Sequence, residues 1–176
     1  MNKVKHNSGN CEWYTPPAIM EVCRAALDGH IDIDPASCAK ANEIVQADIF
    51  YTKEDDGLSK NKKWHGRVFL NPPYRQPDVS LFVDKLIHAK KSRYKITFRA
   101  ILLVNNATDT KWFQKALQNC DLVCFPKRRI RFLDADLHPQ PSPLHGNAIF
   151  YFGDDYEDFA HASKTLSKLG VVLQHT

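Results

Sequence analysis

The sequence predicts an α/β fold in which a mostly parallel sheet carries helices on both faces. Two continuous apolar runs, residues 68–70 and 100–104, suit strands of a parallel sheet that are covered on both sides. Segments with helical apolar periodicity stand between the predicted strands, as crossovers between parallel strands require. The chain has 176 residues, 43% of them hydrophobic, which suits one domain with its own core.

The first predicted helix follows a polar tail. Residues 1–10 are polar, and we expect a flexible tail there, with the folded domain covering residues 11–176. Thr15 is a favourable N-cap, and Pro16 suits the first helical position. An apolar stripe then continues the helix to about Leu27, where an Asp-Gly pair ends it.

Alternating apolar and acidic residues at positions 31–34 predict a short strand that ends at Asp34 and Pro35. Asn71 follows Asp34 by only 37 residues. Each crossover between parallel strands needs about a dozen residues or more, so two further strand–helix units do not fit in this interval. We therefore expect a trimmed sheet, with at most one short extra strand or helix at residues 43–50 and a loop over residues 53–65.

The central strand is predicted at residues 68–70, because Pro72 and Pro73 cannot donate to a sheet ladder. An Asn-Pro-Pro-Tyr turn thus lies at the carboxyl end of a strand, where open α/β sheets place their active sites. The Asn71 side-chain oxygen and the Pro72 carbonyl are two acceptors for the N–H groups of a nucleobase amine. Tyr74 offers an aromatic face on which a flipped base can stack.

The rest of the chain continues the alternation of helices and strands. Helices are predicted at residues 78–91, capped by Asp78, at 110–118, capped by Thr108 or Asp109, and at 155–168, ended by Gly170. Strands are predicted at residues 100–104, 122–125 and 147–152, with an edge strand at 171–173. Residues 126–132 read as a further strand, which places Ile130 and Phe132 on one face and Arg129 and Arg131 on the other.

Basic residues concentrate beside the predicted catalytic edge. These candidate nucleic-acid contacts are Arg75, Lys127, Arg128, Arg129 and Arg131. Such a cluster suits a nucleic-acid backbone, although a solvated polar strand face is the open alternative. Residues 134–146 predict an irregular loop over the active face, and this loop and residues 53–65 are the candidates for substrate readout.

The Asn71-Pro72-Pro73-Tyr74 turn resembles the catalytic motif of S-adenosylmethionine-dependent amino-methyltransferases, chiefly the DNA adenine-N6 methyltransferases. Trp-Tyr-Thr-Pro at residues 13–16, Asp-Gly-Leu at 56–58 and Arg-Ile-x-Phe at 129–132 stand in the order of the small phage-type (Dam-like) enzymes. This resemblance implies a Rossmann-like class I methyltransferase sheet, with catalysis by Asn71, Pro72, Pro73 and Tyr74. It also implies S-adenosyl-L-methionine as cofactor and double-stranded DNA as partner.

The same resemblance implies a cofactor site built from the segment before the first strand, the end of that strand and a later acidic position. The residues implied are Trp13, Tyr14, Thr15, Pro16, Asp32, Asp34, Pro35, Ala36 and Asp48. The family's glycine-rich loop is missing, because residues 36–39 contain no glycine. The backbone is therefore expected to approach a ligand less closely there. For Asp48 a solvated loop acid is the open alternative.

Net charge and cysteine content indicate which partners and which cellular compartment suit the chain. The net charge of +4 is compatible with nucleic acid. Five cysteines without a tight framework, and no histidine cluster around Cys120 and Cys124, predict reduced thiols in the cytoplasm of a bacterial or phage-infected cell, with no metal site. No apolar run reaches the length of a membrane span.

These patterns lead to the hypothesis that the chain methylates N6 of adenine in DNA after base flipping, without a separate target-recognition domain. Two alternatives stay open. The same turn also serves amino-methyltransferases that modify RNA bases or protein glutamine. The missing glycine loop is compatible with a non-catalytic module that binds nucleic acid on the same fold.

Overall fold

The computed structural model describes residues 13–92, 97–141, 143–153 and 156–174. The helices in this part of the chain are α1 (Pro17–Ala26), α2 (Ala39–Val45), α3 (Asp78–Lys91), α4 (Lys111–Leu117) and α5 (Tyr156–Leu166). The strands are β1 (Ile33–Asp34), β2 (Ile49–Phe50), β3 (Arg67–Leu70), β4 (Arg99–Asn105), β5 (Leu122–Pro126), β6 (Asn147–Phe152) and β7 (Gly170–Gln174). The tail expected at residues 1–10 lies outside the described residues.

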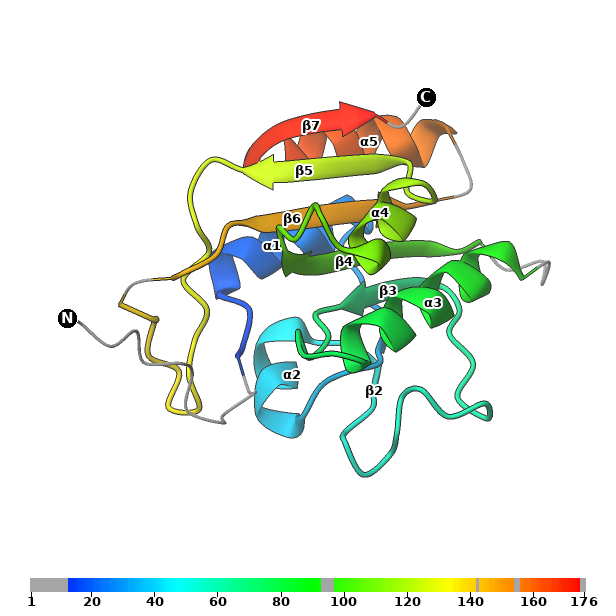
Figure 1. Ribbon diagram of the computed structural model, residues 1–176, viewed down its shortest axis with the longest axis vertical. Helices are drawn as coiled ribbons and strands as arrows, with labels where there is room; N and C mark the ends of the chain where they lie inside the picture. Colours follow the sequence, from blue (N-terminus) through cyan, green and yellow to red (C-terminus); the bar gives the residue numbers. More distant parts are fainter. Residues whose placement is uncertain (1–12, 93–96, 142, 154–155, 175–176) are drawn as a thin grey trace.

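All these strands join one sheet in the order β2-β1-β3-β4-β6-β5-β7 (Figure 1). The pairs β1–β2, β1–β3 and β3–β4 are parallel, whereas β6 runs antiparallel to β4 and β5, and β7 antiparallel to β5. Strands β1 to β5 therefore share one direction, and their carboxyl ends meet at one edge of the sheet. This arrangement confirms the predicted α/β fold, and the carboxyl edge is where open α/β sheets generally bind their ligands.

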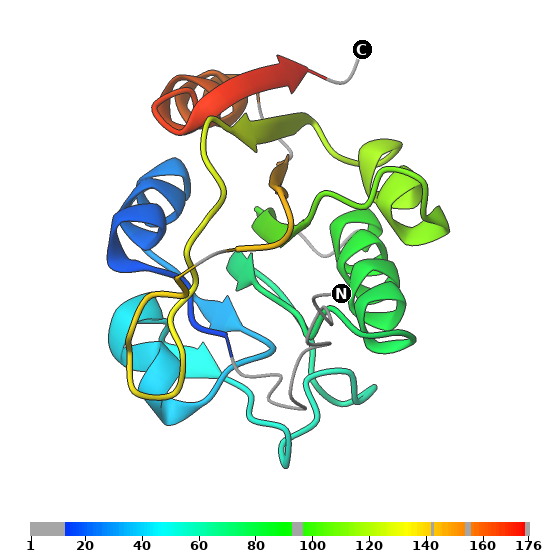
Figure 2. The same ribbon diagram turned by 60° about the vertical axis from the view of Figure 1, so that its left-hand side comes forward.

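Two cores cover the two faces of the sheet. Figure 2 shows α1 and α2 on one side of the sheet and α3 and α4 on the other. Along β3, Val68 and Leu70 pack with α3 and α4, whereas Phe69 packs with α1 and α5. This alternation follows from the period of two in a strand, and burial on both sides explains why the run is apolar throughout.

The sheet is trimmed, as the short interval between Asp34 and Asn71 predicts. Only α2 and β2 stand between β1 and β3, one element more than expected. The loop that follows β2 packs closely on the turn after β1, since a Cβ added at Gly57 would lie 1.9 Å from the Pro35 carbonyl oxygen. The Gly57 carbonyl accepts hydrogen bonds from Trp64 Nε1 (3.1 Å) and Lys85 Nζ (2.9 Å). These contacts hold the loop against the β1 turn.

Several predicted helix ends are wrong by one or a few residues. Pro16, not Thr15, occupies the N-cap position of α1, because the Thr15 side chain is engaged elsewhere. Asp78 is the first residue of α3, not its cap, and Thr110 caps α4 by accepting from the Phe113 amide at 3.4 Å. Gly170 begins β7 and does not end α5. Of these helix starts only that of α4 has a capping side chain, because Pro16 and Pro77 precede α1 and α3 without a side-chain cap hydrogen bond.

The strand predicted at residues 126–132 is also wrong. Strand β5 ends at Pro126, and after it only Leu133 pairs with other chain segments, through isolated bridges to Tyr14 and Pro139. The predicted alternation nevertheless holds, because Ile130 and Phe132 are buried while Arg129 and Arg131 are exposed. The segment lies outside the sheet, and its polar groups bond to side chains and loops instead.

The described part of the chain contains no helix that is long and apolar enough to cross a membrane. Its four cysteines, Cys23, Cys38, Cys120 and Cys124, are free thiols.

Candidate active site

The polar turns that follow β1 and β3 lie together at the carboxyl edge of the sheet. Asp34 ends β1, Asn71 follows β3, and the two strands are neighbours in the sheet. The segment that precedes α1 crosses the same edge, as Figure 1 shows. The structure therefore brings together the Asn71–Tyr74 turn, the β1 turn and residues 13–16.

Three hydrogen bonds fix the side-chain amide of Asn71. Its Nδ2 donates to the Trp13 carbonyl and to Thr15 Oγ1, each at 3.3 Å. Its Oδ1 accepts from the Tyr74 hydroxyl at 2.7 Å. Both amide hydrogens are thus used by the N-terminal segment, and this directs the acceptor oxygen away from that segment, towards Tyr74.

Tyr74 packs between the two cores with its hydroxyl turned inward. Burial raises the pKa of its phenol, so the group is neutral and acts as a donor. It donates to Asn71 Oδ1 and, at 3.5 Å, to the Leu103 carbonyl. Its ring meets Phe132 edge-on, with ring centroids 6.2 Å apart. Phe132, which sequence reasoning left out of the site, is identified here by this aromatic contact.

The two prolines shape the turn between Asn71 and Tyr74. Pro72 is buried and Pro73 partly buried. The Pro72 carbonyl accepts no hydrogen bond from any residue that the structure describes. The Pro72 carbonyl is thus an open acceptor beside Asn71 Oδ1, which accepts from Tyr74.

The N-terminal segment links the catalytic turn to the β1 turn and to the segment after β5. The Tyr14 amide donates to the Leu133 carbonyl at 2.9 Å, and the Leu133 amide donates to the Tyr14 carbonyl at 2.8 Å. The Tyr14 hydroxyl accepts from Cys38 Sγ at 3.5 Å, just beyond the β1 turn. Through Tyr14 and Thr15, residues 13–16 contact both turns of the site.

Asp34 is a buried acid with few partners. Burial raises its pKa to about 7, and the Ala36 amide and the Ser37 hydroxyl nearby oppose this only in part. The Ala36 amide donates to Asp34 Oδ1 at 3.2 Å. Ser37 Oγ is buried and makes no hydrogen bond of normal geometry with the described residues. A buried carboxylate and hydroxyl left short of partners suit a ligand that carries hydroxyl donors and positive charge, as S-adenosylmethionine does.

Tyr51, at the end of β2, is a further site residue that sequence reasoning missed. Its amide donates to the Asp34 carbonyl and its carbonyl accepts from the Ser37 amide, each at 2.9 Å. Lys62 Nζ lies 4.5 Å from its ring centroid. Its place directly after the short apolar pair of β2 is the sequence signal that could have identified it.

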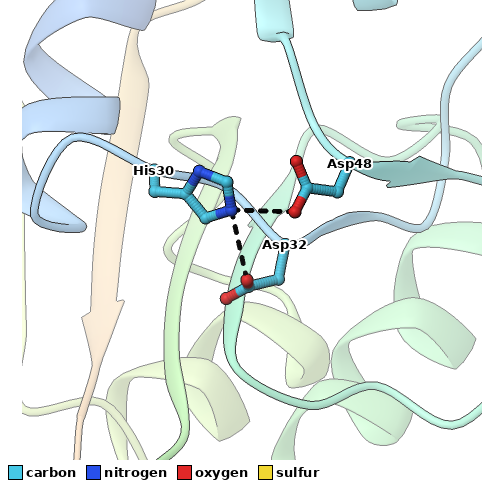
Figure 3. A group of neighbouring side chains, drawn as sticks. All are labelled: His30, Asp32 and Asp48. Carbon is cyan, nitrogen blue, oxygen red and sulfur yellow. Dashed lines mark hydrogen bonds and ion pairs between the residues drawn. The ribbon is translucent and has the colours of Figure 1, made fainter.

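Asp32 and Asp48 do not join this site, which corrects their predicted cofactor role. Both precede their strands, so they lie at the amino ends of β1 and β2, and Figure 3 shows them converging on His30. His30 Nε2 lies 2.9 Å from an Asp48 oxygen and 3.3 Å from an Asp32 oxygen. Asp32 also accepts from the backbone amide of Arg67 (2.6 Å) and from its Nε (3.0 Å).

These contacts give Asp32 a structural role. Burial alone would raise its pKa, but the hydrogen bonds and charge of Arg67, with His30 nearby, outweigh burial and lower it. Arg67 starts β3 and Asn71 follows its end, and four residues of strand span roughly 13 Å. The His30 cluster is therefore separated from the catalytic turn by the length of the strand.

The five predicted nucleic-acid contacts differ in whether they bond to other parts of the described chain. Lys127 and Arg128 are exposed. Arg75 pairs with Asp78 at 2.5 Å. Arg129 donates to the Pro143 carbonyl at 3.1 Å, and Arg131 donates to the Gln140 carbonyl at 2.7 Å. The two arginines thus hold the loop of residues 134–146, which Lys40 also contacts through the Ala135 carbonyl.

Comparisons with known proteins agree with this geometry. Residues 3–164 match the family model described as DNA N-6-adenine-methyltransferase (Dam). The DNA N-6-adenine-methyltransferase of Escherichia phage T1 is 30% identical over 128 residues, which cover 71% of this chain and 45% of that relative. The chain therefore matches a little less than half the length of this curated relative.

A solved structure shows the same fold at low sequence identity. It comes from Listeria monocytogenes, and its description places it among the class I S-adenosylmethionine-dependent methyltransferases. The TM-score is 0.53 at 13% identity, over 87% of this chain and 64% of the other. The predicted class I methyltransferase sheet is thus confirmed as a fold.

Proposed function

The chain belongs to the DNA N-6-adenine-methyltransferase (Dam) family, and from this premise we propose that it transfers a methyl group from S-adenosyl-L-methionine to N6 of adenine in DNA. One observation carries the proposal. At the carboxyl end of β3, Asn71 presents an oriented acceptor oxygen beside the Pro72 carbonyl and the aromatic ring of Tyr74. This combination of groups suits a planar base that carries an amine.

In the proposed reaction, the Asn71–Tyr74 turn changes the geometry of the adenine amine. The lone pair of an exocyclic amine is delocalised into the base, so the amine is a weak nucleophile. Hydrogen bonds from its two N–H groups to Asn71 Oδ1 and the Pro72 carbonyl would draw it towards tetrahedral geometry and localise the lone pair. Bound S-adenosylmethionine would supply an electrophilic methyl group, with S-adenosylhomocysteine as the leaving group once the C–S bond breaks. The N6 nitrogen would lose its extra proton after transfer, so no strong base is required beforehand. The Tyr74 hydroxyl, now on Asn71 Oδ1, would share or yield this oxygen when the amine arrives.

Access to the amine requires that adenine leave the duplex. We propose that the base is flipped to stack on Tyr74, with Phe132 at its edge, because these rings already meet at the site. The cofactor would lie between the β1 turn and the N-terminal segment. Its proposed contacts are Trp13, Tyr14, Thr15, Pro16, Asp34, Pro35 and Ala36, with Ser37 and Tyr51 added from their positions in the fold.

DNA is the proposed partner of this edge. The proposed backbone contacts are Arg75, Lys127, Arg128, Arg129 and Arg131. Arg129 and Arg131 would contact the DNA backbone while also donating hydrogen bonds to the loop of residues 134–146. That loop and residues 53–65 are the proposed readers of sequence. A DNA substrate places the proposed reaction in the cytoplasm of a bacterial or phage-infected cell.

Nucleoside analysis after incubation with labelled S-adenosylmethionine tests the proposal. Duplex DNA that contains adenine is expected to yield N6-methyladenine. Asn71→Ala is expected to abolish turnover while cofactor affinity stays within a few-fold. Label that appears only in RNA or in protein glutamine would instead support another acceptor. Calorimetry that detects no binding of S-adenosylmethionine would support a non-catalytic module.

A further inference from the structure

A basic groove lies at the carboxyl edge, between the start of α1 and the segment after β5. The groove is open and has a volume of about 850 Å³. Five cations line it, Lys127, Arg128, Arg129, Arg131 and Lys168, and no acidic residue is among the described residues of its lining. Lys168 comes from the far end of the chain, so only the fold brings it to the other four.

Strand pairing fixes Lys168 beside Lys127. Pro126 and Gly170 are partners in the β5–β7 pair, and the Lys127 amide donates to the Leu169 carbonyl at 2.9 Å. A Cβ added at Gly170 would lie 1.9 Å from the Phe125 carbonyl oxygen, so glycine permits this close approach. The two lysines therefore occupy a defined place on the rim of the basic groove.

The groove has apolar side chains as well as its charged rim. Ile19, Ile130 and Leu169 contribute to its lining. The Ile130 amide is held by Asn147 Oδ1 at 3.3 Å, and the paired backbones of Tyr14 and Leu133 fix the chain where it approaches the catalytic turn. The lining reaches Pro16, which follows Thr15 in the chain, and Leu133, which pairs with Tyr14.

The charges of the groove are not neutralised within the described part of the chain. None of its five cations takes part in an ion pair there, in contrast to Arg99, which pairs with both Asp28 and Asp158. Arg129 and Arg131 donate to backbone carbonyls, which orient their guanidinium groups but leave their charge. Asp134, in the following loop, accepts from the backbone amides of its own turn, each at 2.9 Å.

We propose that the basic groove holds the phosphodiester backbone of duplex DNA on one side of the flipped adenine, an inference that rests on the proposed function. Lysine and arginine contacts to phosphates supply affinity by releasing counterions, and they set the register of the protein on the duplex. The apolar side chains between the cations suit the sugar faces of the backbone. Lys168 is the contact that the fold adds to the segment after β5.

Charge-removing variants test the groove without any need for turnover. Lys127→Gln/Lys168→Gln removes two exposed cations of the groove that make no hydrogen bond to the loop of residues 134–146. Lys91→Gln/Lys164→Gln removes two exposed cations outside the lining and serves as the matched control. Fluorescence anisotropy with labelled duplex DNA, without cofactor and over a range of KCl concentrations, gives affinity and its salt dependence.

The groove variant is expected to bind duplex DNA on the order of tenfold more weakly at 0.1 M salt, and its log–log salt slope to fall by about 1.8, since each phosphate contact contributes about 0.9. The control is expected to match the wild type. Equal affinity and slope in the two double variants would overturn the proposal, as would groove-dependent binding of RNA but not of duplex DNA. If DNA binding depends on the groove but the wild-type protein forms no N6-methyladenine, the proposed function is rejected, whereas the proposed role of the groove in DNA binding is supported.

Discussion

The Tyr74 hydroxyl donates to Asn71 Oδ1 at 2.7 Å, the same oxygen that the proposed reaction assigns to the adenine amine. The amide does not depend on this bond for its orientation, because Nδ2 is held by the Trp13 carbonyl and Thr15 Oγ1. The hydroxyl and the ring of Tyr74 therefore have separable roles. The hydroxyl occupies an acceptor when no base is bound, and the ring is the surface for stacking.

Tyr74→Phe and Tyr74→Ala separate these two roles. Phenylalanine keeps the ring and frees the acceptor, so kcat/KM for DNA methylation is expected to stay within about tenfold of the wild type. Alanine removes the stacking surface, worth about 1–3 kcal/mol per base, so kcat/KM is expected to fall roughly 5- to 150-fold. Steady-state kinetics on duplex DNA measures both. An equal loss in the two variants would assign the effect to the hydroxyl and contradict the stacking role.

Thr15→Val is expected to lower kcat more than it weakens cofactor binding. The buried Thr15 hydroxyl accepts from Asn71 Nδ2, and valine leaves this donor without one of its two partners. Loss of a buried partner costs about 1–3 kcal/mol, which here loosens the amide that receives the adenine amine. Thr15→Ser keeps the hydroxyl and is expected to restore kcat. If cofactor affinity falls in parallel with kcat, the proposed contact of Thr15 with the cofactor, and not its hydrogen bond to Asn71, is its main role.

Asp34→Asn is expected to change how stability depends on pH. The folded protein holds the Asp34 proton more tightly than the unfolded chain, because burial raises the pKa from 3.8 to about 7. The stabilisation is therefore complete below about pH 4 and is lost as pH rises through 7. Relative to Asp34→Asn, the wild type is expected to lose up to about 4 kcal/mol between pH 4 and pH 8. Urea unfolding at several pH values measures this, and a difference that does not vary with pH would contradict it.

Cofactor affinity provides the complementary measurement at Asp34. A ligand with hydroxyl donors and positive charge prefers the ionised carboxylate, so binding of S-adenosylmethionine is expected to strengthen as pH rises through about 7. Asp34→Asn is expected to bind more weakly and to lose this pH dependence. Calorimetric titrations of both proteins at pH 6 and pH 8 make the comparison, and the same pH profile in the variant would place the titrating group elsewhere.

The sequence predicted the place of the Asn71–Tyr74 turn after β3 because its signals are local. A buried apolar run and two prolines fix the end of β3 whatever the rest of the chain does. The same is true of the strands β4 and β6, whose bounds lie close to those predicted. Local signals also explain the alternation of Ile130 and Arg131 in a segment that is not part of the sheet.

A different cause, a partner far away in the chain, explains the wrong roles predicted for Asp32 and Thr15 and the omission of Lys168. Asp32 and Asp34 have equivalent positions in an alternating sequence pattern. Asp32, however, accepts a hydrogen bond at the amino end of the strand from Arg67, which follows it by 35 residues. Thr15 has the properties of a helix cap, yet its hydroxyl bonds to Asn71, 56 residues away. Lys168 joins the basic groove only through the β5–β7 pair. No local pattern in the sequence encodes these pairings.

Gly57→Ala is expected to damage both stability and cofactor binding. An added Cβ would lie 1.9 Å from the Pro35 carbonyl oxygen, so the loop after β2 or the β1 turn must move. Overpacking of this kind costs about 1–3 kcal/mol, and here the displaced backbone carries Asp34 and Ala36. Thermal unfolding and calorimetry with S-adenosylmethionine measure the two effects.

Gly146→Ala is the matched control, because its Cβ would meet only Asn106 Cβ, at an ordinary 3.8 Å. This variant is expected to keep both the melting temperature and the cofactor affinity of the wild type. The pairing of Gly57 with Pro35 predicts that the first variant loses affinity even at temperatures where it is fully folded, since the defect lies at the β1 turn. If Gly57→Ala is destabilised but binds the cofactor normally when folded, the turn after β1 does not form the cofactor site.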